Sequence, residues 1–304
     1  MKKTLIILLT AVLMSFSATK AATILKLNLE KGQTYKLKSV SQQTITQTMN
    51  GMQMNIETNN TAVLEFLPEA LETDYMLVRV KFDSILSNMN MPMQSIKINT
   101  NKPGNLKNPG DLMNNVMSVL VKNPLEVKFS YTGKVIQIIN AAAIHDSALR
   151  MLDSLPEASK TQMKPIVEMT VNEDALKSMI VLFSYFPDKP VEPGDKWETS
   201  VTIIPRGMEL ITSTKYKLKN ITDGQAIING DVTIESAENA VMNVNGMQMP
   251  FEMRGMGTSE LTIDVKTGWI VNSKSKQKLQ GSITFNGNAM PMDIESTSET
   301  EAIK

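Results

Sequence analysis

Two short methionine-rich segments are the first candidates for chemistry in this sequence. The same five residues, Asn-Gly-Met-Gln-Met, occur at positions 50–54 and again at positions 245–249. Thioether sulfurs are soft ligands that select Cu(I), and flexible methionine side chains can also line an apolar pocket that adapts to its contents. The chain holds 23 methionines but only 8 Phe, 5 Tyr and 2 Trp. Thioethers must therefore also fill part of any core.

Each Asn-Gly pair predicts the turn of a β-hairpin, because a two-residue type I′ turn needs positive φ at both central residues. A third pair, at positions 286–287, follows the same logic. In the two repeated segments the methionines then share one face of the hairpin with their cross-strand partners, and the Gln lies on the other face. The predicted pairs are Met49 with Met52, Gln47 with Met54, Ile45 with Ile56, Val244 with Met247, Met242 with Met249 and Ala240 with Phe251.

Three interpretations of this methionine face remain open. It is a packed core in which thioethers fill gaps, an apolar cavity for a lipid-like ligand, or a soft-metal site. The methionines occupy the positions that a buried face needs, which counts against copper. If the face is a cavity, the residues predicted to line it are Met52, Met54, Met242, Met247 and Met249.

The sequence offers few residues for nucleophilic or metal-dependent catalysis. His145 is the only histidine and cysteine is absent, which excludes a Cys–His site and a zinc site built from several imidazoles. No nucleophile elbow, P-loop or dinucleotide-binding fingerprint occurs. Two carboxylates can meet from distant positions in a chain, so a hydrolase remains a hypothesis. We predict no catalytic residue and no cofactor.

Two charged clusters have simple structural interpretations. Glu192, Asp195 and Glu198 lie beside Trp197 in a Pro-rich segment and are expected to solvate a loop. The second cluster consists of Lys274, Lys276 and Lys278, which alternate with polar residues. This alternation is typical of an exposed or edge strand that must stay soluble.

The predicted elements follow the order β-rich, helical, β-rich. Segments rich in Val, Ile and Thr that alternate with polar residues predict antiparallel strands, while helical spacing and an N-cap at Asn172 predict helices in the middle. Strands are expected at 35–49, 61–67, 75–85, 127–139 (a hairpin), 197–204, 209–220, 225–235, 238–244, 247–253, 260–265, 270–279, 282–285 and 290–302. Helices are expected at 111–122 and 141–155 and after Asn172, with a weaker segment at 165–169.

This order predicts a mainly β (α+β) fold, an antiparallel, curved sheet or open-barrel-like system with a helical insertion at about residues 140–186. We expect a signal peptide at residues 1–22 and a single β-rich domain at residues 23–304. Two β halves, 23–139 and 196–304, are the alternative, because Tyr-Lys-Leu-Lys occurs once in each.

The first residues predict export from the cytoplasm. A basic head (Lys2 and Lys3), an apolar run (Leu5–Leu13) and a small-residue exit before Thr23 are the three parts of a secretory signal. The run is too short to span a membrane, so we expect no transmembrane span after cleavage. Cleavage removes three lysines and leaves 28 basic residues against 31 acidic ones. That balance does not attract nucleic acid.

Three segments, at residues 32–37, 186–198 and 261–270, carry a further pattern. They contain an early Tyr-bearing strand, a Pro- and Gly-containing turn that ends in Trp, and a late Asp-x-x-Thr-Gly strand. The chain resembles the secreted Bacteroidetes-type proteins of the domain of unknown function 6263. The resemblance implies one continuous domain, a location in the periplasm or exterior of a Gram-negative bacterium, and no established activity. The matching residues are Pro190, Gly194, Asp195, Trp197, Asp264, Thr267 and Gly268.

These observations favour a non-enzymatic exported protein that binds an apolar or lipid-like small molecule or mediates contacts in the envelope. A methionine-based copper-binding protein is the alternative. A hydrolase that uses carboxylates is the third hypothesis.

Overall fold

The computed structural model describes residues 22–49, 51–92, 94–102, 104, 111–181, 183, 185–244 and 247–304. Of the predicted signal peptide, only Ala22 lies within these ranges, and Asn50, Asn245 and Gly246 of the predicted turns lie outside them. No helix in the described ranges is long and apolar enough to cross a membrane.

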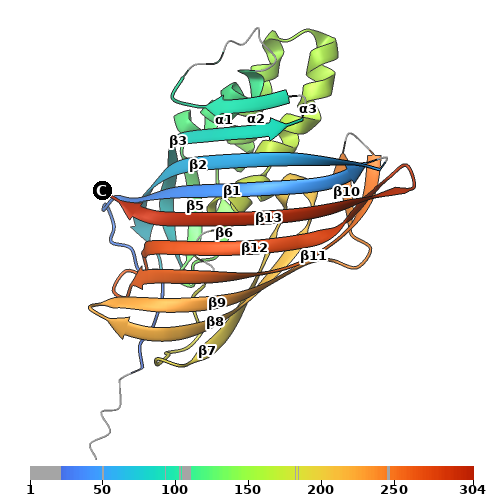
Figure 1. Ribbon diagram of the computed structural model, residues 1–304. Helices are drawn as coiled ribbons and strands as arrows, with labels where there is room; N and C mark the ends of the chain where they lie inside the picture. The colour runs from blue at the N-terminus through green and yellow to red at the C-terminus, as the bar shows by residue number, and fades with distance from the viewer. Residues whose placement is uncertain are drawn as a thin grey trace, which may run out of the picture.

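Within these residues, thirteen antiparallel strands form one curved, unclosed sheet, which confirms the predicted fold class (Figure 1). The strand order is β6-β5-β3-β2-β1-β13-β12-β11-β9-β8-β7, with β4 paired to β3 and β10 paired to β11. β1 and β13 are neighbours from Lys36↔Ile303 to Gln47↔Met292, so both β regions of the sequence belong to one sheet. The strands are β1 Tyr35–Met49, β2 Met52–Leu71, β3 Tyr75–Met91, β4 Gln94–Asn99, β5 Leu125–Ser130, β6 Val135–Ile138, β7 Lys196–Ile203, β8 Leu210–Thr222, β9 Gln225–Ser236, β10 Val241–Val244, β11 Met247–Asp264, β12 Ile270–Phe285 and β13 Asn288–Ile303.

Helices pack against one side of the sheet and lie between its two edges. Helix α1 packs against β3 and β4, and α4 lies against both β6 and β7, the edge strands of the sheet. The predicted cap at Asn172 is confirmed, since its Oδ1 accepts a hydrogen bond of 2.8 Å from the backbone N–H of Ala175. The helices are α1 Leu112–Lys122, α2 Ala141–Leu149, α3 Glu157–Val171 and α4 Glu173–Ile180, with short 3₁₀ turns η2 Arg150–Ser154 and η3 Pro205–Gly207.

Helix α3 is longer than the weak segment predicted at residues 165–169. It runs from Glu157 to Val171 and contains Pro165. Among its residues only Val167 and Val171 are buried, so the sequence has no apolar stripe that would reveal a surface helix. The Glu, Ala, Lys and Gln residues of its first half have high intrinsic helix propensity, and they account for the extra turns.

One end of the curved sheet, the closed end, is sealed by residues 23–32, which we call the strap. Alternate leucines of the strap, Leu25, Leu27 and Leu29, are 1–2 % exposed. Its backbone is bound to separate turns, through Leu27 N–H to the Tyr131 carbonyl and Asn28 N–H to the Thr267 carbonyl. These leucines pack into the closed-end core, a cluster that also contains residues from all four α-helices and from most of the strands. The same cluster holds the aromatic side chains Tyr35, Phe66, Phe129, Phe183, Tyr185, Phe186 and Trp269.

Two long strands cross glycine positions at which the sequence predicted breaks. The breaks expected between 253 and 260 and between 279 and 282 are wrong, because β11 and β12 are continuous. Glycine is needed there for close approach of neighbouring backbones. A Cβ on Gly255 would lie 2.6 Å from the Lys278 carbonyl oxygen, and one on Gly281 would lie 1.9 Å from the Glu252 carbonyl oxygen.

We expect Gly281→Val to lower the free energy of unfolding by about 1–3 kcal/mol, because the new side chain forces β11 and β12 apart. Gln280→Val is the matched control, since Gln280 precedes it in the strand and is exposed. Its effect should stay within about 0.5 kcal/mol. Urea denaturation of the three proteins measures the difference, and equal stability of both variants would refute the close-approach explanation.

Candidate apolar ligand site

The face of the sheet that is turned toward the helices, the inner face, changes character along the strands. In β12, buried Ile270 belongs to the closed-end core, half-buried Ser273 and Ser275 follow, and buried Leu279 and Ile283 come last. The neighbouring strands repeat this order. The inner face therefore has two apolar zones with a polar zone between them.

The polar zone, which we call the polar belt, is a row of small polar side chains across the middle of the inner face, some of which are hydrogen-bonded to one another. Asn60 Nδ2 donates to Ser41 Oγ at 3.3 Å, and Ser87 Oγ donates to Asn60 Oδ1 at 2.6 Å. Thr58, which is only 5 % exposed, lies beside this chain, and its Oγ1 has no hydrogen-bond partner among the described residues. The polar belt consists of Ser39, Ser41, Thr58, Asn60, Ser87, Ser259, Ser273, Ser275, Ser298 and Thr300.

The second apolar zone, which we call the distal cluster, lies beyond the polar belt toward the ends of the hairpins. Its buried members all come from strands, with Met208 and Ala240 from connections packed against them, whereas helices contribute to the closed-end core. Most buried side chains of the closed-end core are 0–3 % exposed, but most of those in the distal cluster keep 4–8 %. The distal cluster is thus the more thinly covered of the two. It consists of Ile45, Leu210, Val232, Ile234, Met242, Phe251, Met253, Leu279, Ile283, Met292 and Ile294.

The five methionines predicted to line a pocket occupy three environments around the distal cluster. Met242 is buried within it, and Met249 is half-buried and packs against it. Met54 is half-buried beside it on β2. Met52 and Met247 are 68 % and 44 % exposed, at the ends of their hairpins. The alternating pattern predicted that these five methionines share one face, but their exposure depends on how far each lies from the end of its hairpin.

The predicted registers of the methionine hairpins are confirmed. In the first hairpin Met49 pairs with Met52, and Gly51 has the positive φ of 76° that the turn requires. In the second, Met242 pairs with Met249. The third hairpin turns at Asn286 and Gly287, with φ of 48° and 78°.

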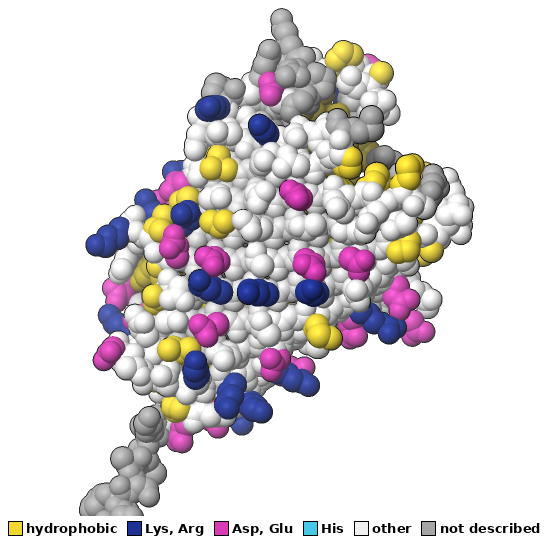
Figure 2. Space-filling model, viewed as in Figure 1, with side chains coloured by type: hydrophobic (Ala, Val, Ile, Leu, Met, Phe, Trp, Pro, Cys, Tyr) yellow, Lys and Arg dark blue, Asp and Glu magenta, His cyan; other side chains and the backbone are white. Residues whose placement is uncertain are grey.

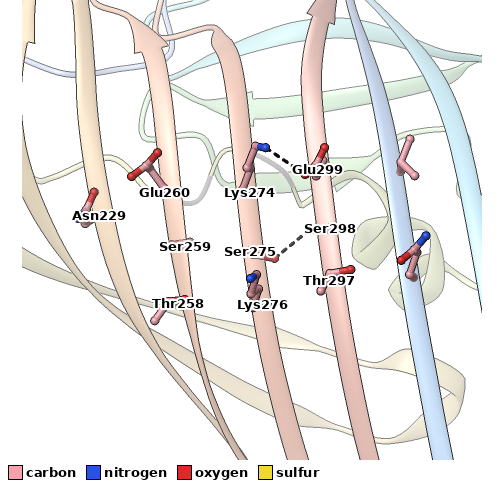
Figure 3. Close-up of a pocket in the computed structure, with 12 residues that line it drawn as sticks. Asn229, Thr258, Ser259, Glu260, Lys274, Ser275, Lys276, Thr297, Ser298 and Glu299 are labelled. Atoms are coloured by element: carbon pink, nitrogen blue, oxygen red, sulfur yellow. Dashed lines mark hydrogen bonds and ion pairs between the residues drawn. The ribbon is translucent and has the colours of Figure 1, made fainter.

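The opposite, outer face of the sheet carries exposed charge and a shallow hollow of about 740 Å³ (Figures 2 and 3). The three predicted lysines lie there on β12, a strand in the middle of the sheet, so they do not mark an edge. Figure 3 shows Lys274 pointing toward Glu299, with 3.1 Å between Nζ and Oε1. Lys278 pairs in the same way with Glu295. Such exposed ion pairs contribute little stability, and this face offers no enclosed site.

The other predicted candidates make local contacts. The His145 imidazole is half-exposed, with Nδ1 3.6 Å from an Asp146 oxygen. Asp195 accepts a hydrogen bond from the Glu192 N–H at 2.8 Å and so shapes its own turn. The Trp197 indole donates to a backbone carbonyl. No group of three or more His, Asp or Glu that could hold a metal ion is found in the described ranges.

Sequence reasoning missed the polar belt and its position between two apolar zones. The signal was present as alternate small polar residues, such as Ser273 and Ser275 between the lysines of β12. Alternation shows that these side chains share a face. It does not reveal that Ser298 of β13 lies opposite Ser275 with 2.8 Å between the two Oγ atoms.

The late Asp-x-x-Thr-Gly segment forms a hydrogen-bonded turn that packs against the strap at the closed end. Asp264 Oδ1 accepts hydrogen bonds from the Thr267 backbone N–H at 2.8 Å and from its hydroxyl at 2.6 Å. Gly268 has a φ of 69°, and a Cβ there would lie 2.2 Å from the Lys26 carbonyl oxygen of the strap. The motif therefore has a structural role.

The model of the Family of unknown function (DUF6263) matches residues 73–270, more than half of the chain.

The chain belongs to the DUF6263 family. No protein of curated function matches this DUF6263 chain in sequence. Among solved structures, lipovitellin, in a study of lipid–protein interactions, is similar with a TM-score of 0.50 and 10 % identity over 90 % of this chain. The DUF6263 chain spans only 25 % of that lipovitellin chain. An outer-membrane channel from Pseudomonas putida F1 gives a TM-score of 0.30 and 6 % identity over 91 % of this chain and 97 % of that one. The likeness to lipovitellin is one of fold.

Proposed function

We propose that this protein binds an apolar, lipid-like molecule at the distal cluster and catalyses no reaction. The observation that carries the proposal is the contrast between the two apolar zones of one inner face. The closed-end core is covered by the strap and by helices, while the described members of the distal cluster all come from strands. The distal cluster is instead enclosed by other strands and by loop residues such as Met208 and Ala240, and an apolar zone without a helical layer is a reasonable place for a binding site.

The entrance to this site would lie among half-buried methionines. Met249 and Met290 pack against the distal cluster from the hairpin side, and Met54 lies near them on β2. Methionine has three rotatable side-chain bonds and fills irregular spaces. Rotation of these side chains would admit an acyl chain or a similar flexible apolar group with little movement of the backbone.

The polar belt would receive the polar group of such a ligand. Thr58 lies between Ile56, at the edge of the distal cluster, and Asn60 of the polar belt. Its Oγ1, which no described residue hydrogen-bonds, is buried, and an unpaired buried hydroxyl costs free energy that a ligand or a water would recover. We therefore expect a ligand with an apolar chain and one hydrogen-bonding end.

The location we propose is the envelope, periplasm or exterior of a Gram-negative, Bacteroidetes-type cell. The support is the secretory pattern of residues 1–22 together with the family resemblance. Processing at Ala21 or Ala22 would be seen by mass spectrometry of the exported protein.

Two measurements test the proposed ligand site. Solvent extraction of the purified exported protein, followed by mass spectrometry, should release a lipid-like molecule. After extraction, a fluorescent fatty acid should bind saturably, and Met249→Glu should weaken its affinity at least about tenfold because it places a charge at the apolar entrance. Met256→Glu is the matched control, since Met256 is on the same strand but 73 % exposed on the outer face.

The proposal fails if the native protein yields no such molecule and the extracted protein does not bind the fluorescent fatty acid. It also fails if Met249→Glu and Met256→Glu weaken binding equally, because the inner face would then have no special role. Far-ultraviolet circular dichroism of both variants confirms that each is folded before binding is compared.

A further inference from the structure

Four hairpins reach the end of the sheet opposite the strap. Pairing of Gln47 with Met292, of Ile283 with Met290 and of Phe251 with Ile283 places the ends of β1–β2, β12–β13 and β10–β11 beside one another. The β3–β4 hairpin reaches the same end next to β2. Figure 1 shows the ends of β1–β2, β12–β13 and β10–β11 together, away from the strap. We call these four hairpin ends the hairpin rim.

The four hairpin ends of the rim hold no charged residue in the sequence. Charged residues occur in the connections beside them, with Glu238 between β9 and β10 and with Arg206 and Glu209 between β7 and β8, where the 3₁₀ turn η3 contacts β10. In the sequence, the segments around these hairpins, at residues 39–56, 84–96, 239–251 and 279–292, contain no Asp, Glu, Lys, Arg or His. They hold eleven of the 23 methionines of the chain. Figure 2 shows hydrophobic side chains near the hairpin ends, a group of charged side chains just below them on the same side, and further charged side chains across the middle and the opposite end of this face.

Apolar side chains project from three separate hairpin ends of the rim. Met52 of β2 is 68 % exposed, Met247 of β11 is 44 % exposed and Phe285 of β12 is 36 % exposed. Val241 adds a fourth such side chain on β10, at 48 %. Their neighbours within each turn are Asn, Gln and Gly. The three apolar side chains at the turns, Met52, Met247 and Phe285, are therefore separate points flanked by neutral polar residues.

The closed end also has exposed apolar side chains, but charges accompany them. Exposed Ile24, Leu71 and Ile136 each lie within two residues of a charged side chain, provided by Lys26, Glu72 and Lys134 respectively. Lys266 and Glu30 form an exposed ion pair at the same end. The exposed apolar side chains of the closed end thus lie beside charges, whereas those of the hairpin rim lie in segments without charge.

We propose that the hairpin rim docks on the surface of a neutral phospholipid bilayer, with Met52, Met247 and Phe285 entering the interfacial layer. Moving a charge out of water is costly, and the rim has none to move. The hairpin ladders pair the backbone close to the ends, as at Met49↔Met52 and Phe285↔Asn288. Separate apolar points suit a lipid layer, which deforms around each of them, better than a second copy of the chain, which needs a continuous complementary patch. Docking in this orientation would place the methionine entrance of the distal cluster at the lipid surface.

Flotation of the purified exported protein with phosphatidylcholine vesicles tests this inference. The wild-type protein should bind, and the double variant Met52→Asp/Phe285→Asp should bind at least about tenfold more weakly, because it brings two charges to the rim. Leu71→Asp is the matched control: Leu71 is 46 % exposed at the closed end, and its replacement should leave binding unchanged. Added phosphatidylglycerol or high salt should have little effect, since no charge attraction is involved.

The inference is overturned if the wild-type protein does not float with neutral vesicles, if Leu71→Asp weakens binding as much as the rim variant, or if binding requires anionic lipid. It is also overturned if the rim variant changes only self-association in sedimentation, which would assign the rim to a second copy of the chain. This test is separate from that of the ligand site, because the rim variant should retain binding of the fluorescent fatty acid in solution.

Discussion

Phe66→Ala is expected to lower the free energy of unfolding by about 3–5 kcal/mol, the range for removal of a fully buried aromatic ring. Phe66 is 0 % exposed. Its ring centroid lies 5.3 Å from that of Trp269, 5.6 Å from that of Phe183 and 6.4 Å from that of Phe129. These partners come from three distant parts of the chain, so one truncation opens a cavity where β2, β5, the segment after α4 and the start of β12 meet. Domains of this kind are stable by only about 5–15 kcal/mol, and the loss is a large share of that.

Urea denaturation followed by tryptophan fluorescence measures this change. Phe285→Ala is the matched control, since it removes the same atoms from a ring that is 36 % exposed at the hairpin rim. It should cost less than half as much as Phe66→Ala. If the two substitutions cost the same, the closed-end core is not the main source of stability that the aromatic cluster indicates.

Local turn chemistry explains why the hairpins could be predicted from the sequence. Asn-Gly needs only its own backbone to set a turn, and the register of each hairpin follows from that turn. The pairs Met49↔Met52 and Met242↔Met249 were therefore obtained correctly without any knowledge of the rest of the fold. The N-cap at Asn172 is local in the same sense.

Long-range neighbours explain what could not be predicted. The pairing of β1 with β13 joins residues about 250 positions apart, and it decides which inner-face side chains meet in the distal cluster. The glycines of β11 and β12 looked like breaks because the carbonyl groups that crowd them belong to the other strand. The difference between exposed Met52 and buried Met242 likewise depends on distance from the hairpin end, which alternation does not encode.

The second large effect is expected at alkaline pH and comes from Tyr185. This side chain is 3 % exposed, packs on Phe186 with 4.4 Å between ring centroids, and donates a hydrogen bond of 2.8 Å to the Gly268 carbonyl. Burial raises the pKa of Tyr185 well above its ordinary value of 10, and the charge of an ionised Tyr216 would raise it further. A phenolate is poorly solvated at this position, and its hydrogen bond to the carbonyl would be lost.

The sign of the effect follows from proton binding in the two states. Below pH 10 the tyrosine is protonated in both the folded and the unfolded chain, so its contribution to stability is fully present. Above that pH the unfolded chain releases the proton while the folded chain keeps it. The free energy of unfolding should then fall by about 1.4 kcal/mol per pH unit for this one group, until the pH reaches the raised pKa of the folded state.

Urea denaturation at about pH 9 and at about pH 11 measures this slope, and Tyr185→Phe should reduce it. At neutral pH the same variant should be less stable by about 1–3 kcal/mol, because the buried Gly268 carbonyl loses its donor. Tyr131→Phe removes a comparable bond of 2.8 Å, to the Glu72 carbonyl, at an exposed site, and it should keep the wild-type slope. Hydrogen bonds to carboxylates also raise the pKa of Lys81, Lys266 and Lys278, but this contribution is common to all three proteins. Equal slopes for wild type and Tyr185→Phe would mean that the closed end opens before Tyr185 ionises, and that the strap does not seal it as tightly as its buried leucines indicate.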